Sequence, residues 1–214
     1  RILELGCGDG ALWTQNIQFL PQDISITLSD LSSGMIRDAR RALGRKDKRF
    51  SFEVFDCAKI PHKGCNFDLV IANHVLFYCE DIPAVCNEIQ RVLVPGGKLI
   101  CSTYGSHHMQ EVSQLVQDFD NRIVLSADRL YERFGRENGA DILAPYFSDI
   151  SWESYNDSLL VPDAEPLISY ILSCHGNQNQ YLLDKYTDFR GFVSRKTKDG
   201  FFITKDAGIF LCEK

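Results

Sequence analysis

Three glycines at alternate positions form the segment of this chain whose residue types most clearly indicate a chemical role. They are Gly6, Gly8 and Gly10, and they directly follow a short apolar run. Glycine has no Cβ, so it tolerates positive φ angles and lets backbone amides approach a bound group closely. Two carboxylates accompany the loop, Glu4 within the apolar run and Asp30 further along the chain. These residue types predict a ligand-binding loop next to an acceptor of hydroxyl hydrogen bonds.

The glycine spacing fits two kinds of nucleotide-binding loop. Gly6-x-Gly8-x-x-Ala11 matches the loose dinucleotide fingerprint, in which Asp30 would bind a ribose. The same segment, written Glu-x-Gly-x-Gly-x-Gly, resembles the first motif of class I S-adenosylmethionine-dependent methyltransferases. The loop alone leaves both possibilities open, so the choice depends on segments further along the chain.

Later segments resemble methyltransferase motifs in the order in which that family has them. Residues 24–30 have the pattern of a strand that ends in an acid, and residues 31–35 resemble the family's D-x-S-x-x-M segment. Residues 52–58 also have the pattern of a strand ending in an acid, and residues 67–73 are nearly all apolar, as in a strand buried on both faces. Residues 89–99 contain Arg-x-Leu-x-Pro-Gly-Gly, which is typical of these methyltransferases and not expected of nicotinamide-binding domains.

The resemblance covers about residues 1–105 and implies a fold. We expect an α/β, doubly wound, Rossmann-like sheet of seven mostly parallel strands, with an antiparallel last strand and a helical insertion before it. Residues 1–214 are expected to form one methyltransferase domain, with residues 106–214 as the acceptor-side half. Because the chain opens inside the expected first strand, we also expect that an upstream N-terminal segment is missing.

The spacing of apolar residues predicts several further elements. Asp9 is expected to cap the helix after the glycine loop, and Asp81 to cap a later helix. The expected helices outside the insertion lie at about residues 35–43, 82–93, 109–119 and 130–143. The expected later strands lie at residues 99–104, 150–160, 201–204 and 209–212.

The insertion and the chain end carry two more specific expectations. Residues 161–198 are expected to hold a pair of helices that begin near Pro166 and Gln178. The last two strand segments are expected to be joined by a turn at residues 205–208.

Composition sets limits on the partners. With 214 residues, of which 44% are hydrophobic and 24% charged, the chain can bury a sizeable core. A net charge of −6 argues against a large nucleic-acid surface. Basic residues do cluster around one predicted helix, and we interpret them as a solvated helix face. The cluster comprises Arg37, Arg40, Arg41, Arg45, Lys46, Lys48 and Arg49.

The eight cysteines contain no C-x-x-C pair, and several fall within apolar strands. We therefore expect reduced thiols that pack as small hydrophobic groups, with no metal site. No apolar run approaches the length of a membrane span and no signal peptide is recognisable, so a cytoplasmic protein without a membrane partner is expected. The oligomeric state is not predicted.

The resemblance implies how S-adenosylmethionine would be held. Its methyl group moves by in-line displacement, leaving S-adenosylhomocysteine, so the protein must mainly align donor and acceptor and exclude water. Asp30 would accept both ribose hydroxyls, and Glu4 would support the glycine loop. The backbone of the glycine loop would contact the methionine end of the cofactor. Two apolar side chains and an acid would contact adenine, and a backbone carbonyl would contact the cofactor amine. The full set is Glu4, Gly6, Cys7, Gly8, Gly10, Asp30, Leu31, Met35, Asp56, Cys57 and Asn73. Plainer alternatives remain open: Asp56 could cap a turn, and Met35 could belong to the core.

Aromatic and histidine side chains after the fourth and fifth strands are candidates for the acceptor side. His74 is the candidate general base, because a histidine with a pKa near neutrality can take a proton from an acceptor. A structural role is equally open for His74 and is favoured for His107 and His108. Tyr78 and Tyr104 are candidates for lining the acceptor pocket.

Three classes of function are consistent with the sequence. The first is methyl transfer to a small molecule, which the acidic chain and the lack of an Asn-Pro-Pro-Tyr motif favour. The second is methyl transfer to RNA or protein. The third is a non-catalytic cofactor-binding module or a nicotinamide oxidoreductase; the segment Pro95-Gly96-Gly97 argues against the oxidoreductase, and retention of the expected acids argues against the binding module.

Overall fold

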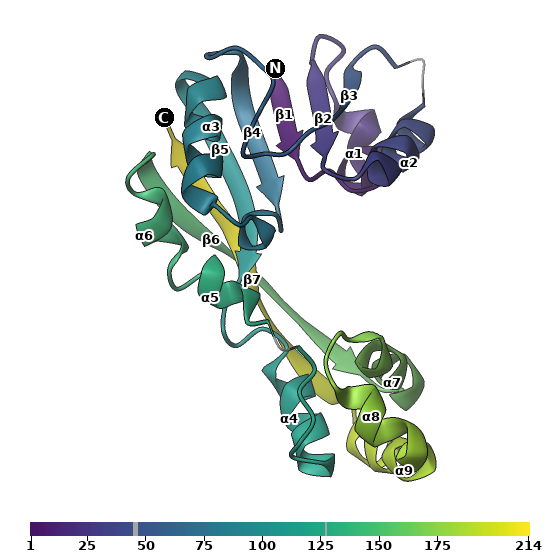
Figure 1. Cartoon of the computed structure of the whole chain (residues 1–214). Coiled ribbons are helices and arrows are strands. Elements are labelled where there is room, and N and C mark those ends of the chain that lie inside the picture. The colour runs from purple at the N-terminus through teal and green to yellow at the C-terminus, as the bar shows by residue number, and fades with distance from the viewer. Residues whose placement is uncertain (45–46, 127) are drawn as a thin grey trace. The chain divides into compact units, whose positions relative to one another are not determined.

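The computed structural model describes residues 1–44, 47–126 and 128–214, which fall into two compact units (Figure 1). The first unit comprises Arg1–Thr103, Phe134–Glu153 and Gly208–Lys214, and the second comprises Tyr104–Arg133 and Ser154–Ala207. Strands β6 (Ser148–Val161) and β7 (Phe201–Glu213) contribute residues to both units. The expectation of one domain with two functional halves stays a prediction.

A seven-stranded sheet has the strand order β3-β2-β1-β4-β5-β7-β6. Strand β1 pairs in parallel with β2 and β4, β2 pairs in parallel with β3, and β4 with β5. The β5-β7-β6 end is antiparallel. The predicted fold is therefore confirmed. The first five strands are β1 (Ile2–Leu5), β2 (Ile26–Asp30), β3 (Phe50–Val54), β4 (Phe67–Asn73) and β5 (Leu93–Tyr104).

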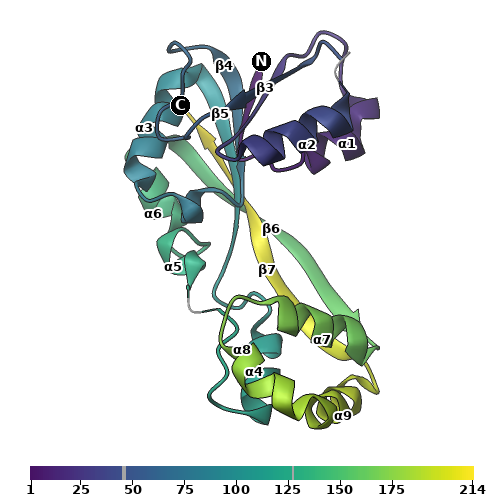
Figure 2. The same cartoon turned by 45° about the vertical axis from the view of Figure 1, so that its right-hand side comes forward.

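Helix α2 (Ser33–Leu43) shows why the sequence folds locally as it does. Its apolar residues Ile36, Ala39 and Leu43 recur at helical spacing, are buried, and belong to the same core cluster as residues of β2 and β3. Ser32 begins the helix by accepting a hydrogen bond from the Met35 amide at 3.3 Å. Figure 2 shows α2 next to α1 (Ala11–Asn16), which continues into the 3-10 turn η1 (Ile17–Phe19).

Helix α3 (Ile82–Val92) follows the 3-10 turn η2 (Leu76–Tyr78). The Asp81 carboxylate accepts a hydrogen bond from the Ala84 amide at 2.9 Å, so the predicted cap is confirmed. The prediction that Asp9 is the N-cap of α1 is wrong, because Gly10 occupies that position with a left-handed φ of 79°. Asp9 still accepts a hydrogen bond from the Ala11 amide at 3.1 Å.

The helix predicted over residues 130–143 is two short helices, α5 (Leu130–Arg133) and α6 (Gly139–Leu143). The interruption has a local cause, since the Asn138 side chain accepts a hydrogen bond from the Gly135 amide at 2.7 Å. Asparagine competes for backbone groups and glycine is a poor helix former.

The predicted turn at residues 205–208 is wrong, because β7 runs through it without a break. Gly208 has a packing role instead. A Cβ on Gly208 would lie 2.3 Å from the Glu153 carbonyl oxygen and 2.6 Å from the Trp152 ring. The glycine therefore permits the close approach of two backbones within the sheet.

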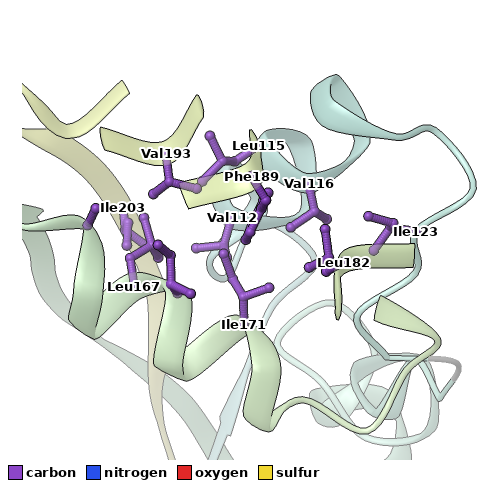
Figure 3. Packing of buried hydrophobic residues seen from close by; sticks show 12 residues of the cluster. Val112, Leu115, Val116, Ile123, Leu167, Ile171, Leu182, Phe189, Val193 and Ile203 are labelled. Atoms are coloured by element: carbon purple, nitrogen blue, oxygen red, sulfur yellow. The ribbon is translucent and has the colours of Figure 1, made fainter. Parts of the chain in front are cut away.

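The second unit has a helical core of its own (Figure 3). Its helices are α4 (Gln110–Phe119), α7 (Ala164–Ser173), α8 (Gln178–Leu182), the 3-10 turn η3 (Leu183–Lys185) and α9 (Tyr186–Thr197). The insertion thus holds three α-helices among its described residues, where the sequence predicted a pair. No glycine or proline marks the break between α8 and α9. Figure 3 labels the buried side chains Val112, Leu115, Val116, Ile123, Leu167, Ile171, Leu182, Phe189, Val193 and Ile203.

Within the described part of the chain, no helix is both long enough and apolar enough to cross a membrane.

Candidate functional site

A pocket of about 680 Å³ lies in the first unit, where strands β1 to β4 end. The chain moves outward from β1 to β2 and β3 and then returns to β4 on the other side of β1. Such a reversal of strand order is where open α/β sheets bind ligands. The lining residues are Gly6, Ser29, Asp30, Leu31, Phe55, Asp56, Cys57, Ala58, His74, Val75, Tyr78, Cys79, Glu80, Asp81 and Val85.

The glycine loop takes the conformation that its sequence predicts. Gly6, Gly8 and Gly10 have φ angles of 65°, 55° and 79°, in the left-handed region that glycine enters without steric cost. Gly6 lines the pocket, while Gly8 and Gly10 do not. Gly10 packs on α2, where its Cβ would lie 3.3 Å from the Ala39 Cβ.

Gly6 and Gly8 provide a matched test of the close packing between the glycine loop and Val75. A Cβ on Gly6 would lie 2.4 Å from Val75 Cγ2, whereas a Cβ on Gly8 would have nothing within 4 Å. Both substitutions by alanine cost conformational energy, but Gly6→Ala also displaces Val75. We expect Gly6→Ala to lower the free energy of unfolding by about 1–3 kcal/mol more than Gly8→Ala. Urea unfolding of the cofactor-free proteins measures the difference; equal losses would contradict the packing argument.

The Asp30 carboxylate is fixed by two backbone amides. Its Oδ2 accepts a hydrogen bond from the Gly8 amide at 3.1 Å, and its Oδ1 accepts one from the Ser32 amide at 2.8 Å. A carboxylate has about four lone-pair sites, so each oxygen retains the capacity to accept another hydrogen bond. The amides thus orient an acceptor at the pocket wall and also connect Asp30 to the glycine loop.

Glu4 is buried behind the loop and does not line the pocket, with 3% of its surface exposed. Its Oε2 accepts a hydrogen bond from Trp13 Nε1 at 2.5 Å, and its backbone oxygen accepts one from Ser29 Oγ at 2.8 Å. Burial raises the pKa of Glu4 from 4.5 to about 7; the Trp13 bond opposes this shift and the charge of Asp30 adds to it. Glu4 therefore connects β1 to α1 on either side of the glycine loop.

The residues predicted to contact adenine divide into two groups. Leu31, Asp56 and Cys57 line the pocket, and Leu31 is 73% exposed, which leaves its side chain available to a ligand. Asp56 also accepts a hydrogen bond from the Ala58 amide at 2.9 Å, so the turn-capping alternative describes a contact that exists. Met35 is exposed, so it does not belong to the core, and it does not line the pocket.

His74 and Tyr78 line the same pocket from the segment that follows β4. His74 has a φ of 54°, unusual for a residue with a side chain. Its amide donates to the Ser102 carbonyl oxygen at 3.2 Å and to Ser102 Oγ at 3.1 Å, which holds this conformation. Asn73 is the last residue of β4 and pairs with Ser102 in the sheet; its side chain is not part of the pocket lining.

Cys7 and several unpredicted residues complete the description of the first unit. Cys7 is buried outside the pocket lining, and burial raises the pKa of its thiol to about 12. The lining residues that the sequence did not predict as site residues mostly neighbour predicted ones along the chain. The consecutive acids Glu80 and Asp81, which follow the fourth strand, are a sequence signal that could have indicated the site. The unpredicted residues are Ser29, Phe55, Ala58, Val75, Cys79, Glu80, Asp81 and Val85.

Tyr104, His107 and His108 belong to the second unit. The Tyr104 and His108 ring centroids lie 5.1 Å apart. The His107 amide donates to Asp206 Oδ2 at 3.4 Å, and His107 Nδ1 lies 3.8 Å from the same oxygen. These are structural contacts within the unit, and a role of the three residues toward the acceptor stays a prediction.

The basic cluster separates into structural and solvent-facing members. Arg49 pairs with Asp47 at 2.7 Å and donates to the Leu20 carbonyl at 3.0 Å, so it is structural. Arg37, Arg40 and Arg41 line a second pocket of about 490 Å³ on α2. Arg45 and Lys46 of the predicted cluster lie outside the described residues.

Comparison with known proteins finds similarity to methyltransferases. The model of the methyltransferase domain matches residues 3–101. Curated relatives include the biotin biosynthesis bifunctional protein BioHC of Saccharophagus degradans, which is 32% identical over 58% of this chain and 22% of the relative. A malonyl-[acyl-carrier protein] O-methyltransferase of Enterobacter lignolyticus is 29% identical over 57% of this chain and 46% of the relative. Phosphoethanolamine N-methyltransferase 3 of Arabidopsis thaliana is 26% identical over 73% and 37%. The chain spans less than half the length of these relatives.

Solved structures share the fold at low sequence identity. The YcgJ protein of Bacillus subtilis has a TM-score of 0.65 and 13% identity, covering all of this chain and 91% of that protein. A phosphoethanolamine N-methyltransferase of Haemonchus contortus, in complex with phosphomonomethylethanolamine and S-adenosylhomocysteine, has a TM-score of 0.58 and 19% identity. That match covers all of this chain and 49% of the Haemonchus protein.

Proposed function

We propose that this chain is a class I S-adenosylmethionine-dependent methyltransferase that transfers a methyl group from S-adenosylmethionine to a small-molecule acceptor. The observation that supports this most strongly is the Asp30 carboxylate. Two amides fix it at a pocket wall, between the glycine loop that follows β1 and the start of α2. A fixed anionic acceptor at this position suits a ribose diol.

The pocket fits the cofactor in volume and in chemistry. Its volume of about 680 Å³ falls within the range of about 300–1,000 Å³ that is usual for ligand sites. The side chain that any other residue would carry at Gly6 would collide with Val75, another residue of the pocket lining, so the loop can keep this conformation beside Val75 only with glycine at this position. Leu31 offers an exposed apolar surface, and Asp56 a carboxylate, on the side where adenine is expected.

The residues would act mainly by positioning. S-adenosylmethionine supplies an activated methyl group when it is bound. Asp30 orients the ribose, the glycine loop approaches the methionine end, and the apolar lining limits access of water. The contacts proposed for Cys7, Gly8, Gly10, Met35 and Asn73 would involve backbone groups or side chains outside the present lining.

Ligand screening by thermal shift tests the proposed function. We expect S-adenosylmethionine and S-adenosylhomocysteine to raise the unfolding temperature, because a ligand at 100 times its Kd stabilises a protein by about 2.7 kcal/mol. NAD is the control ligand. A labelled-methyl assay over pooled metabolites and RNA then identifies the acceptor. Stabilisation by NAD alone, or no stabilisation by either sulfur compound, would remove the proposal.

His74 is the residue proposed to act on the acceptor as a general base. We expect His74→Ala to lower the rate constant of methyl transfer at least tenfold, because proton transfer by a positioned histidine contributes this much or more. The affinity for S-adenosylhomocysteine should change little. The pH-rate profile of the wild type should show an acidic limb, a fall in rate toward low pH as the base is protonated, and the variant should lack it. Unchanged turnover with the true acceptor would exclude this role, and His62→Ala, outside the pocket lining, is the matched control.

The names of the relatives support a small acceptor group. One is named for O-methylation of a malonyl group on an acyl-carrier protein and another for N-methylation of phosphoethanolamine. Both reactions place the methyl group on a short polar moiety. Tyr78, which is 66% exposed in the pocket lining, is the residue of the first unit proposed to contact such an acceptor.

An acidic macromolecule is the second candidate acceptor, because three guanidinium groups line the pocket on α2. Arg40 donates to the Phe52 carbonyl at 3.3 Å and Arg41 lies 3.5 Å from Asp38, so both have structural partners as well. The variant Arg37→Glu separates the two candidates. Loss of methyl transfer to RNA or a carrier protein, with S-adenosylhomocysteine affinity intact, would favour the macromolecule. Unchanged activity toward a small metabolite supports the first proposal.

A further inference from the structure

Two thiols lie side by side in the lining of the proposed cofactor pocket. Cys57 Sγ and Cys79 Sγ are 3.5 Å apart, and both residues are half-buried. Cys57 lies in the segment after β3, and Cys79 directly follows the 3-10 turn η2 after β4. Both residues line the pocket.

The thiol contact brings together segments that start far apart in the sheet. Strands β3 and β4 are separated by β2 and β1, and with strands about 4.8 Å apart their ends are separated by about 14 Å. The pocket lies over the ends of the intervening strands, with Gly6 after β1 and Asp30 at the end of β2. The contact therefore joins two parts of the pocket lining.

We propose that Cys57 and Cys79 form a reversible disulfide that restricts the pocket and weakens cofactor binding. The effect on the cofactor rests on the proposed function, whereas formation of the bond does not. A disulfide requires a sulfur–sulfur distance of about 2.05 Å, so the two sulfur atoms must approach each other by about 1.5 Å. The segments that carry them supply most of the lining residues.

The reaction requires an oxidant of the low-molecular-weight disulfide class, such as glutathione disulfide. The thiolate of one cysteine attacks a sulfur of the oxidant, forms a mixed disulfide and releases one glutathione thiolate. The second cysteine thiolate then attacks the mixed disulfide at the protein sulfur and releases the other glutathione. The protein loses two electrons and two protons, and the oxidant becomes two thiols.

The neighbouring thiol and burial govern the rate of thiol–disulfide exchange at Cys57. Cys79, followed by desolvation, raises the pKa of Cys57, which makes its thiolate scarce at neutral pH. Exchange is therefore slow, and oxidation over hours is the appropriate condition.

Restriction follows from where the linked residues lie. Residues 55–58 form one part of the lining, and the segment 74–81 contributes another. A disulfide draws these two segments together. The linked segments can then no longer move apart to admit the adenine ring of the cofactor. The bond should therefore act as a lock that lowers affinity without touching Asp30 or the glycine loop.

Three measurements on the full chain test the proposal. The protein is incubated with glutathione disulfide, digested under non-reducing conditions and analysed by mass spectrometry for a linked pair of peptides that contain Cys57 and Cys79. Hydrogen exchange of residues 55–58 and 74–79 is compared between the oxidised and reduced protein. Calorimetry with S-adenosylhomocysteine is then run on both forms, and again after treatment with dithiothreitol.

We expect the linked peptides, slower hydrogen exchange in both segments, and affinity at least tenfold weaker that dithiothreitol restores. Cys79→Ser and Cys57→Ser should each abolish the oxidant's effect, while Cys65→Ser, an exposed cysteine outside the pocket lining, should behave as the wild type. Absence of the linked peptides, or linkage with unchanged exchange or affinity, would overturn the proposal. If the reduced protein does not bind S-adenosylhomocysteine, the proposed function fails, and the peptides and the exchange still decide whether the lock exists.

Discussion

Replacement of Asp30 by alanine is expected to weaken binding of S-adenosylhomocysteine by about a hundredfold. Two hydroxyl hydrogen bonds to a charged carboxylate, each contributing about 1.5 kcal/mol, amount to about 3 kcal/mol. The substitution also leaves the Gly8 and Ser32 amides without their present acceptor, so the glycine loop loses an anchor. Isothermal titration calorimetry measures the affinity directly.

Two further variants separate the direct contact from the loss of the loop anchor. Asp30→Asn retains one oxygen that can accept a hydrogen bond but lacks the charge, so its affinity should fall between those of the wild type and Asp30→Ala. Asp38→Ala removes an exposed acid of α2 that is not in the pocket lining and should bind like the wild type. An affinity of Asp30→Ala within threefold of the wild type would exclude the ribose contact.

The parts of this site that follow from local sequence could be predicted. The loop after β1 needs glycine because its φ angles are positive, and Asp30 comes at the end of a strand that an apolar run identifies. Strand order then places the ends of β1 and β2 side by side. A short-range pattern therefore determines both which residues approach a ligand and on which edge of the sheet they lie.

Contacts between distant segments were not accessible in the same way. The spacing of Cys57 and Cys79 in the sequence gives no indication that their sulfur atoms lie 3.5 Å apart. Strand β7 likewise runs without a break through residues whose local sequence favours a turn, and Gly208 packs closely against Glu153 there. Some tertiary contacts override local preference or join loops across the sheet. Such contacts are seen only in the three-dimensional structure.

The role of Glu4 shows the same division between local and distant information. Its place before the glycine loop identified it as part of the site, but its hydrogen bond to Trp13 and its burial emerge only from the packing of α1. That bond is the physical basis for the prediction that Glu4 supports the loop. Whether it also affects the cofactor stays a proposal.

Replacement of Glu4 by glutamine is expected to stabilise the cofactor-free protein by about 3 kcal/mol at pH 8. Burial raises the pKa of this carboxyl from 4.5 to about 7, and each pKa unit corresponds to about 1.4 kcal/mol. Between these pH values the folded protein binds more protons at Glu4 than the unfolded chain does, so the contribution of Glu4 to stability falls as the pH rises. Glutamine resembles the protonated acid, can still accept from Trp13, and does not titrate.

Urea unfolding of the wild type and Glu4→Gln at pH 5 and pH 8 measures this difference. The two proteins should be close in stability at pH 5, and the variant should be the more stable at pH 8. Glu88→Gln provides a control without pH dependence in this range, because Arg91 lowers the pKa of Glu88 below 4.5 and the carboxylate is already ionised in both the folded and the unfolded protein at pH 5 and pH 8. A difference between wild type and Glu4→Gln that does not change with pH would show that Glu4 is already ionised at pH 5. In that case the hydrogen bond from Trp13 would outweigh burial, reversing the order of the two effects inferred from the structure.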